Sequence, residues 1–133
     1  MTHRFDLRVY YEDTDLAGIV YYANYLRFIE RARTEWVRGL GIDQVRLREE
    51  EDIVFAVRRV EADYLRPAVF DDLLTVETAL VSMTGARIVL SQRVLRGDER
   101  LFDAVVVDYV PAGVVINEAT TTTVDFTLVD TAG

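Results

Sequence analysis

The sequence has no cysteine and a single histidine, and both shortages limit the chemistry open to it. Without cysteine, the chain can form no disulfide, no thiolate metal site and no cysteine nucleophile. The one histidine, His3, lies near the N-terminus, where we expect a frayed, exposed segment. We therefore expect no metal site and no cofactor, and we expect acid–base chemistry to depend on Asp, Glu or Tyr side chains.

The sequence also lacks lysine and any long apolar run. Its fifteen basic residues face 23 acidic ones, which gives a net charge of −8. This balance argues against sequence-independent binding to nucleic acid, because such binding needs a basic face that neutralises phosphates. No stretch of about eighteen apolar residues occurs, and the N-terminus has no apolar signal core. We therefore expect a cytoplasmic, soluble protein without a membrane span.

The residues that are present predict a single α+β domain over all 133 positions. Alternating apolar and polar residues predict a first strand over 4–10, and apolar residues at three- and four-residue spacings predict a long helix over about 22–40. Gly39 and Gly41 supply the left-handed conformation that ends many helices. Four further strands are predicted at 53–64, 72–82, 86–96 and 101–110, after a polar surface segment. This order favours an antiparallel sheet packed on one helix.

An acidic turn immediately before the long helix is the most informative segment for function. It contains Asp13, Thr14 and Asp15, followed by Gly18 and the expected helix start near Tyr22. A helix N-terminus offers unpaired N–H groups to a carbonyl oxygen, and a nearby carboxylate can attack the carbonyl carbon or activate water. On spacing alone, however, such residues more commonly form an Asx turn or cap the helix.

The same segment resembles the signature of the 4-hydroxybenzoyl-CoA thioesterase family, in particular its YbgC-like branch, which is associated with the Tol-Pal cluster. The similarity runs through the pairs and short motifs Arg8-Val9, Thr14-Asp15, Gly18-Ile19-Val20, Tyr25, the stretch 30–35, Val57-Arg58, Pro67-Ala68 and the stretch 71–76. The resemblance implies a hot-dog fold, in which an antiparallel sheet wraps around one long α-helix. It also implies a homodimer or homotetramer with active sites between subunits.

Site residues follow from the resemblance position by position. Asp15 matches the catalytic aspartate, as nucleophile or general base, and the backbone N–H of Tyr22 matches the donor that polarises the thioester carbonyl. Gly18 matches the glycine that permits close approach of the substrate. Tyr11 and Tyr25 are expected to line or support the pocket, with a packed core aromatic as an equal alternative for each.

Three features depart from the family pattern. Tyr22 stands where YbgC-like members commonly carry histidine, and a tyrosine there is typical of the aryl-CoA enzymes. In the loop 84–87, where those enzymes have a basic segment for nucleotide phosphates, only Arg87 is charged, so it is the one candidate phosphate contact there. No basic residue follows Arg100, and the tail after about residue 108 does not resemble the usual ending; its β-branched residues could form an extra strand.

The leading hypothesis is therefore hydrolysis of an acyl-CoA or aryl-CoA thioester, with acyl carrier protein as a second possible donor of the acyl group. An acidic carrier protein is slightly disfavoured by the negative charge of this chain. The alternative is a hot-dog module that binds an acyl ligand or scaffolds a complex without catalysis. A hot-dog dehydratase is a third possibility, disfavoured because that chemistry generally uses a histidine.

Overall fold

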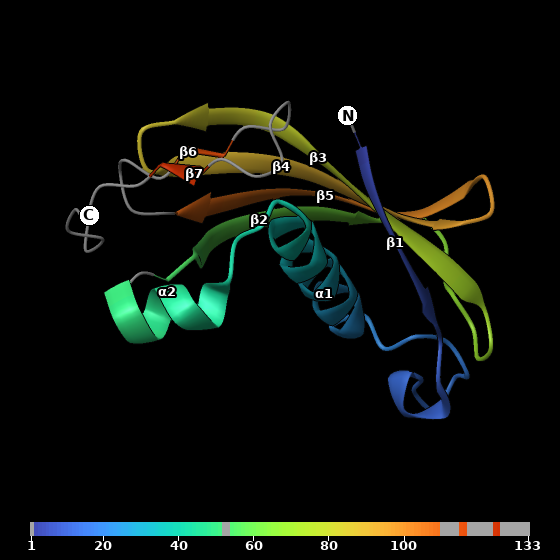
Figure 1. Ribbon diagram of the computed structural model, residues 1–133. Helices are drawn as coiled ribbons and strands as arrows, with labels where there is room; N and C mark the ends of the chain where they lie inside the picture. Colours follow the sequence, from blue (N-terminus) through green and yellow to red (C-terminus); the bar gives the residue numbers. More distant parts are fainter. Residues whose placement is uncertain (1, 52–53, 110–114, 117–123, 126–133) are drawn as a thin grey trace.

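Five strands form one antiparallel sheet in the order β1-β3-β4-β5-β2 (Figure 1). The computed structural model describes residues 2–51, 54–109, 115–116 and 124–125. The strands of the sheet are β1 (Thr2–Arg8), β2 (Ala56–Tyr64), β3 (Leu73–Thr84), β4 (Arg87–Arg96) and β5 (Glu99–Tyr109). All five were predicted, with boundaries that differ by a few residues.

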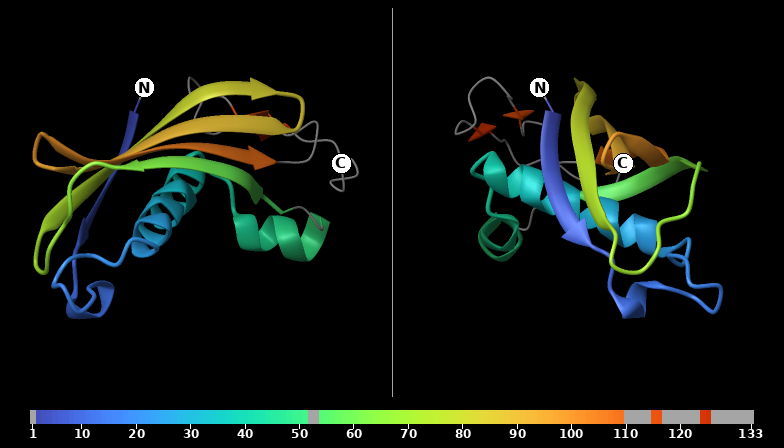
Figure 2. Two further views of the ribbon diagram at one scale, coloured as in Figure 1. Left: turned by 180° about the vertical axis from the view of Figure 1, so that it is seen from behind. Right: turned by 90° about the vertical axis from the view of Figure 1, so that its right-hand side faces the viewer.

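The long helix α1 (Asn24–Gly39) lies against the concave face of this strongly curved sheet (Figure 2). Its buried side chains repeat at three- and four-residue spacings, as the sequence predicts: Tyr25, Phe28, Ile29, Ala32, Trp36 and Val37. They meet inward residues of the strands, including Leu74, Leu90 and Phe102, which are fully buried. Each large apolar side chain buried in this way contributes about 1.5–3 kcal/mol. The interface between helix and sheet is therefore the core.

The helix begins two residues later than the predicted start at Tyr22, for a visible reason. The N–H of Leu26 donates to the carbonyl of Ala23, while the carbonyl of Tyr22 accepts a hydrogen bond of 2.9 Å from the Tyr64 hydroxyl. Tyr22 therefore belongs to the turn that leads into α1. At the other end, only Gly41 has the expected positive φ, at 84°, because Gly39 is the last helical residue.

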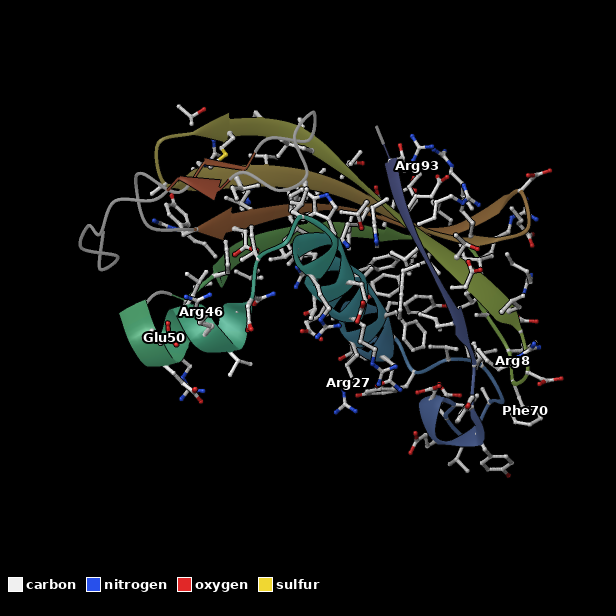
Figure 3. The ribbon with its side chains drawn as sticks, viewed as in Figure 1. Arg8, Arg27, Arg46, Glu50, Phe70 and Arg93 are labelled. Carbon is white, nitrogen blue, oxygen red and sulfur yellow. The ribbon has the colours of Figure 1, made fainter. Side chains whose placement is uncertain are left out.

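The polar segment after α1 forms a short helix, α2 (Gln44–Glu51), which carries the exposed ion pair between Arg46 and Glu50 (Figure 3). Of the helices that the structure describes, none is long and apolar enough to cross a membrane. Ahead of α1, the acidic turn contains a single 3-10 turn, η1 (Tyr11–Asp13).

The structure of the two ends of the chain can be compared with the sequence predictions for them. The expectation of a frayed N-terminus at His3 is wrong, because His3 is a half-buried residue of β1 that pairs with Thr78 of β3. In the tail, β6 (Val115–Ile116) and β7 (Val124–Asp125) pair with each other in a separate two-stranded sheet. Most of the other tail residues, including the threonine run at 120–123, lie outside the described residues.

Candidate active site

The loop that carries Asp15 is a tight turn closed by backbone hydrogen bonds. The N–H of Asp15 donates to the carbonyl of Ile19 at 2.9 Å, and the N–H of Gly18 donates back to the carbonyl of Asp15 at 3.0 Å. Thr14 and Val20 form an antiparallel bridge at the base of the loop. Gly18 has a φ of 79°, a conformation that L side chains rarely adopt, so glycine is needed for the turn.

The carboxylate of Asp15 is engaged on one side only. Its Oδ1 accepts a hydrogen bond of 2.8 Å from the N–H of Ala17, and this contact forms an Asx turn. No hydrogen bond to Oδ2 arises from the part of the chain that the structure describes, and the residue is exposed. By contrast, Asp13 and Thr14 both serve the local turn, through the N–H of Tyr10 and the carbonyl of Tyr11. The turn-forming role of Asp15 therefore leaves one carboxylate oxygen available for chemistry.

The start of α1, a few residues beyond this loop, has no side-chain cap. The residue before the helix is Ala23, which cannot accept a hydrogen bond through its side chain. The N–H of Asn24 donates to the carbonyl of Tyr21, but the N–H of Tyr22 reaches no carbonyl among the described residues. The predicted donor is thus an N–H without a hydrogen-bond partner in the described part of the chain, at the positive end of the helix dipole and suited to an oxygen that gains negative charge.

An apolar pocket of about 300 Å³ opens between the Asp15 loop, the start of α1 and the end of β2. Its lining residues are Ile19, Val20, Tyr22, Tyr25, Tyr64, Leu65, Arg66 and Pro67. Tyr25 forms the buried part of this wall and stacks on Phe102, with ring centroids 5.1 Å apart. Tyr25, one of the two tyrosines expected to line or support a pocket, lies in this lining and is at the same time a core aromatic; Tyr22, expected to act through its backbone N–H, also lies in the lining.

Three tyrosines at or near the pocket, Tyr21, Tyr25 and Tyr64, have a pKa raised above the ordinary value. Burial raises the pKa of Tyr25 and of Tyr64 above the ordinary value of 10.0. A hydrogen bond with Tyr22 raises the pKa of Tyr21, and the carboxylate of Asp15 acts in the same direction. The ring centroids of Tyr21 and Tyr22 lie 4.9 Å apart, and Tyr22 lines the pocket. The raised pKa values disfavour the hydroxyls of Tyr21, Tyr25 and Tyr64 as bases.

The turn between β2 and β3, over residues 66–72, fixes the pocket from the other side. The carbonyl of Ala68 accepts from the N–H of Val20 at 2.9 Å, and the N–H of Ala68 donates to the Tyr25 hydroxyl at 2.9 Å. Ile19 and Val69 form a second antiparallel bridge. Both walls of the pocket are therefore tied together by main-chain hydrogen bonds. The Pro67-Ala68 pair was part of the sequence signature, but its bond to Tyr25 was not predicted.

Two of the predicted site residues lie elsewhere in the described chain. Tyr11 is the first residue of η1, outside the pocket lining, and its ring packs edge-on against Phe70, which Figure 3 labels, with centroids 5.9 Å apart. Arg87 begins β4, at the end of the sheet opposite the Asp15 loop (Figure 1). A single chain does not bring Arg87 to the pocket, so a contact with substrate would need a second subunit. The roles of Tyr11 and Arg87 stay predictions.

Comparison with known proteins gives this geometry a family context. Residues 17–102 match the sequence profile of the Thioesterase superfamily. The acyl-CoA thioesterase YbgC of Haemophilus influenzae is 48% identical over 102 residues, which are 77% of this chain and 75% of that protein. The acyl-CoA thioester hydrolase YbgC of Escherichia coli O157:H7 is 42% identical over 100 residues, 75% of this chain and 74% of that protein.

Solved structures give the same result for the fold. The probable thioesterase of Bartonella henselae superposes with a TM-score of 0.80 at 35% identity, covering 96% of this chain and 99% of that one. A 4-hydroxybenzoyl-CoA thioesterase bound to its substrate superposes with a TM-score of 0.77 at 23% identity, covering 84% and 85%, which supports the fold alone. The predicted hot-dog fold is confirmed, and this chain belongs to the thioesterase superfamily, among its YbgC-like members.

Proposed function

We propose that this protein hydrolyses acyl-CoA thioesters to the free acid and CoA, with Asp15 as the catalytic carboxylate. The observation that carries the proposal is the Oδ2 of Asp15, which accepts no hydrogen bond from the described residues, on a loop held beside an uncapped helix start and an apolar pocket. A thioester needs these three elements together: a group that attacks or activates water, a donor for the carbonyl oxygen, and room for the acyl chain.

The reaction can follow two routes from this arrangement. In one, Asp15 takes a proton from water as the water oxygen attacks the carbonyl carbon, and the C–S bond then breaks to release the thiolate. In the other, Asp15 attacks the carbon itself, releases the thiolate and forms an anhydride that water hydrolyses. Either way, the N–H of Tyr22 donates to the carbonyl oxygen as it gains charge. One proton of the water passes to the released thiolate, by way of Asp15 in the first route, so that thioester and water become carboxylic acid and thiol.

The pocket favours a modest acyl group that contacts aromatic rings. Its wall is formed by Tyr22, Tyr25 and Tyr64, whose rings meet edge-on, with centroids 5.5–6.2 Å apart for the pairs with Tyr64. Such rings accept aliphatic chains and also stack with aryl groups.

CoA is favoured over acyl carrier protein as the thiol because an acidic protein is repelled by a chain with a net charge of −8. Since acyl-CoA is a cytoplasmic metabolite, the proposal implies a cytoplasmic location.

A homodimer through β2 is part of the proposal. β2 is one of the two edge strands of the sheet, the other being β1, and all nine residues of β2 are exposed. Its basic half carries Arg58 and Arg59, and its acidic half carries Glu61 and Asp63. A second copy pairing antiparallel on this edge would set each basic half against an acidic half. An apolar groove next to the strand, lined partly by Val60, would be covered by the same contact.

The proposal is tested by thiol release from short aliphatic, long aliphatic and aromatic acyl-CoA thioesters. Wild type is compared with Asp15→Asn and with Glu49→Gln, a matched loss of one exposed carboxylate on α2. We expect turnover that is lost in Asp15→Asn and unchanged in Glu49→Gln, with circular dichroism confirming that all three proteins are folded. Wild-type turnover in a folded Asp15→Asn protein contradicts the assignment. Ligand binding without turnover of either CoA or carrier-protein thioesters favours the non-catalytic module.

A further inference from the structure

Arg96, the last residue of β4, donates hydrogen bonds to three residues, Asp72, Pro67 and Glu99. Its Nη1 donates to the Asp72 carboxylate at 2.7 Å and to the Pro67 carbonyl at 3.3 Å. Its Nε and Nη2 both donate to Oε1 of Glu99, at 3.1 and 2.7 Å. The second oxygen of Glu99 accepts from Arg66, which lines the pocket. One guanidinium thus ties the turn at 66–72 to the β4–β5 hairpin.

From Asp72 the connection continues to the Asp15 loop without a gap. The Asp72 oxygen that binds Arg96 also accepts from the N–H of Val69 at 2.9 Å. Val69 forms the antiparallel bridge with Ile19, whose carbonyl accepts from the N–H of Asp15 at 2.9 Å. Every step from guanidinium to catalytic loop is therefore a hydrogen bond or a backbone bridge.

The placement of Arg96 distinguishes it from the ordinary surface arginines of this chain. Its side chain is 34% exposed and that of Asp72 only 18%, so the pair is partly shielded from solvent. Arg100, four residues later, is half exposed and makes one ion pair with Asp103, at 3.4 Å. Exposed pairs of that kind contribute little, whereas shielded, charge-assisted hydrogen bonds of defined geometry hold their partners in place.

We propose that Arg96 is a positioning residue, which holds the 66–72 turn, and through it the Asp15 loop, in the geometry that hydrolysis requires. Arg96 is not among the residues that line the pocket, so it acts through the turn and not on the substrate. Only a planar guanidinium can direct donors toward Asp72, Pro67 and Glu99 at once; a lysine ammonium reaches fewer of them. The inference rests on the proposed function, since it assigns Arg96 a task in the reaction of Asp15.

The test compares Arg96→Met and Arg96→Lys with the control Arg100→Met, using thiol release from the best acyl-CoA substrate. Because a small misplacement of a catalytic group is costly, we expect kcat to fall roughly tenfold to a hundredfold in Arg96→Met. KM should stay within about threefold, since the pocket walls remain. Arg96→Lys should recover part of the loss, and Arg100→Met should match wild type.

Amide hydrogen exchange supplies a readout that a general loss of stability does not imitate. In Arg96→Met, amide exchange should accelerate over residues 15–20 and at Ala68 and Val69, and should stay unchanged in α1 and the strand centres. Wild-type kcat together with unchanged exchange in these segments overturns the inference. Should Arg96→Met fail to fold, kcat is compared between Asp72→Asn, Arg96→Lys and the double variant that carries both changes. If Arg96 acts through Asp72, the two losses in kcat do not add in the double variant; additive losses contradict the inference.

Asp15→Asn is measured in the same series, so that the two proposals can fail separately. Turnover that persists in Asp15→Asn rejects the proposed function, whatever Arg96 does. Loss of turnover in Asp15→Asn with full activity in Arg96→Met leaves the function standing and rejects the role of Arg96 alone.

Discussion

Replacing Tyr25 by phenylalanine tests how strongly the pocket wall is tied to the turn at 66–72. The change removes one oxygen, which accepts the N–H of Ala68 at 2.9 Å in a fully buried setting. The phenyl ring keeps the stacking on Phe102 at 5.1 Å. Since the N–H of Ala68 then has neither protein nor water to bind, the free energy of unfolding should drop by about 1–3 kcal/mol. For a chain of this length, each kcal/mol lowers the melting temperature by roughly 3–6 °C.

Urea denaturation of Tyr25→Phe measures this loss, with Tyr109→Phe as the matched control. The hydroxyl of Tyr109 accepts only a 3.3 Å hydrogen bond from exposed Arg58, so its removal should change the free energy of unfolding by less than about 0.5 kcal/mol. All samples need the same protein concentration, because subunit association contributes to stability. Equal midpoints for Tyr25→Phe and Tyr109→Phe would refute the claim that the bond to Ala68 holds the turn.

Three further predictions concern the loop, the ion pairs and the sheet edge. Gly18→Ala should lower kcat, because alanine at this positive φ costs about 1–2 kcal/mol although its Cβ would meet no atom within 4 Å. Gly18→Asn should retain more activity than Gly18→Ala in the same thiol-release assay. Equal kcat values for wild type and both variants contradict the need for a left-handed conformation at residue 18. Arg96 holds the pKa of Glu99 below its ordinary value of 4.5. The ion pair between them therefore stabilises the folded state above pH 4.5, and this contribution is lost as the pH falls through the lowered pKa. Urea denaturation at a series of acidic pH values should show the free energy of unfolding falling more steeply, as the pH is lowered, for wild type than for Glu99→Gln. Parallel plots of this free energy against pH argue against a stabilising ion pair between Arg96 and Glu99. Val60→Lys on β2 should yield inactive monomers in light scattering, whereas Val105→Lys, of similar exposure on β5, should keep the dimer; an active Val60→Lys monomer excludes a site shared between subunits.

The elements and the turn that carries Asp15 could be predicted from the sequence because their signals are local. The spacing of Tyr25, Ile29 and Trp36 marks one helical face, and the acidic turn with Gly18 lies within a few residues of Asp15. Local patterns of that kind do not depend on how distant segments pack.

The residues that complete the site could not be predicted in this way. Phe102 stacks on Tyr25, and Arg96 binds Asp72, only because strands far apart in the chain are paired in a definite register. Their sequence neighbourhoods read as ordinary strand ends, with nothing to separate Arg96 from Arg100. The late start of α1 has a similar origin, because the Tyr22 carbonyl is taken by a tyrosine 42 residues away.

The Asp15 loop is held almost wholly by main-chain groups, and this affects how freely its sequence can vary. Leu16, at the tip, is fully exposed, and Ala17 contributes only its N–H. Side chains at these two positions can therefore be exchanged without moving the carboxylate, as long as glycine follows at position 18. The tip is a natural place to graft new residues that meet the part of a substrate outside the pocket, so that selectivity can be redesigned while the chemical step is preserved.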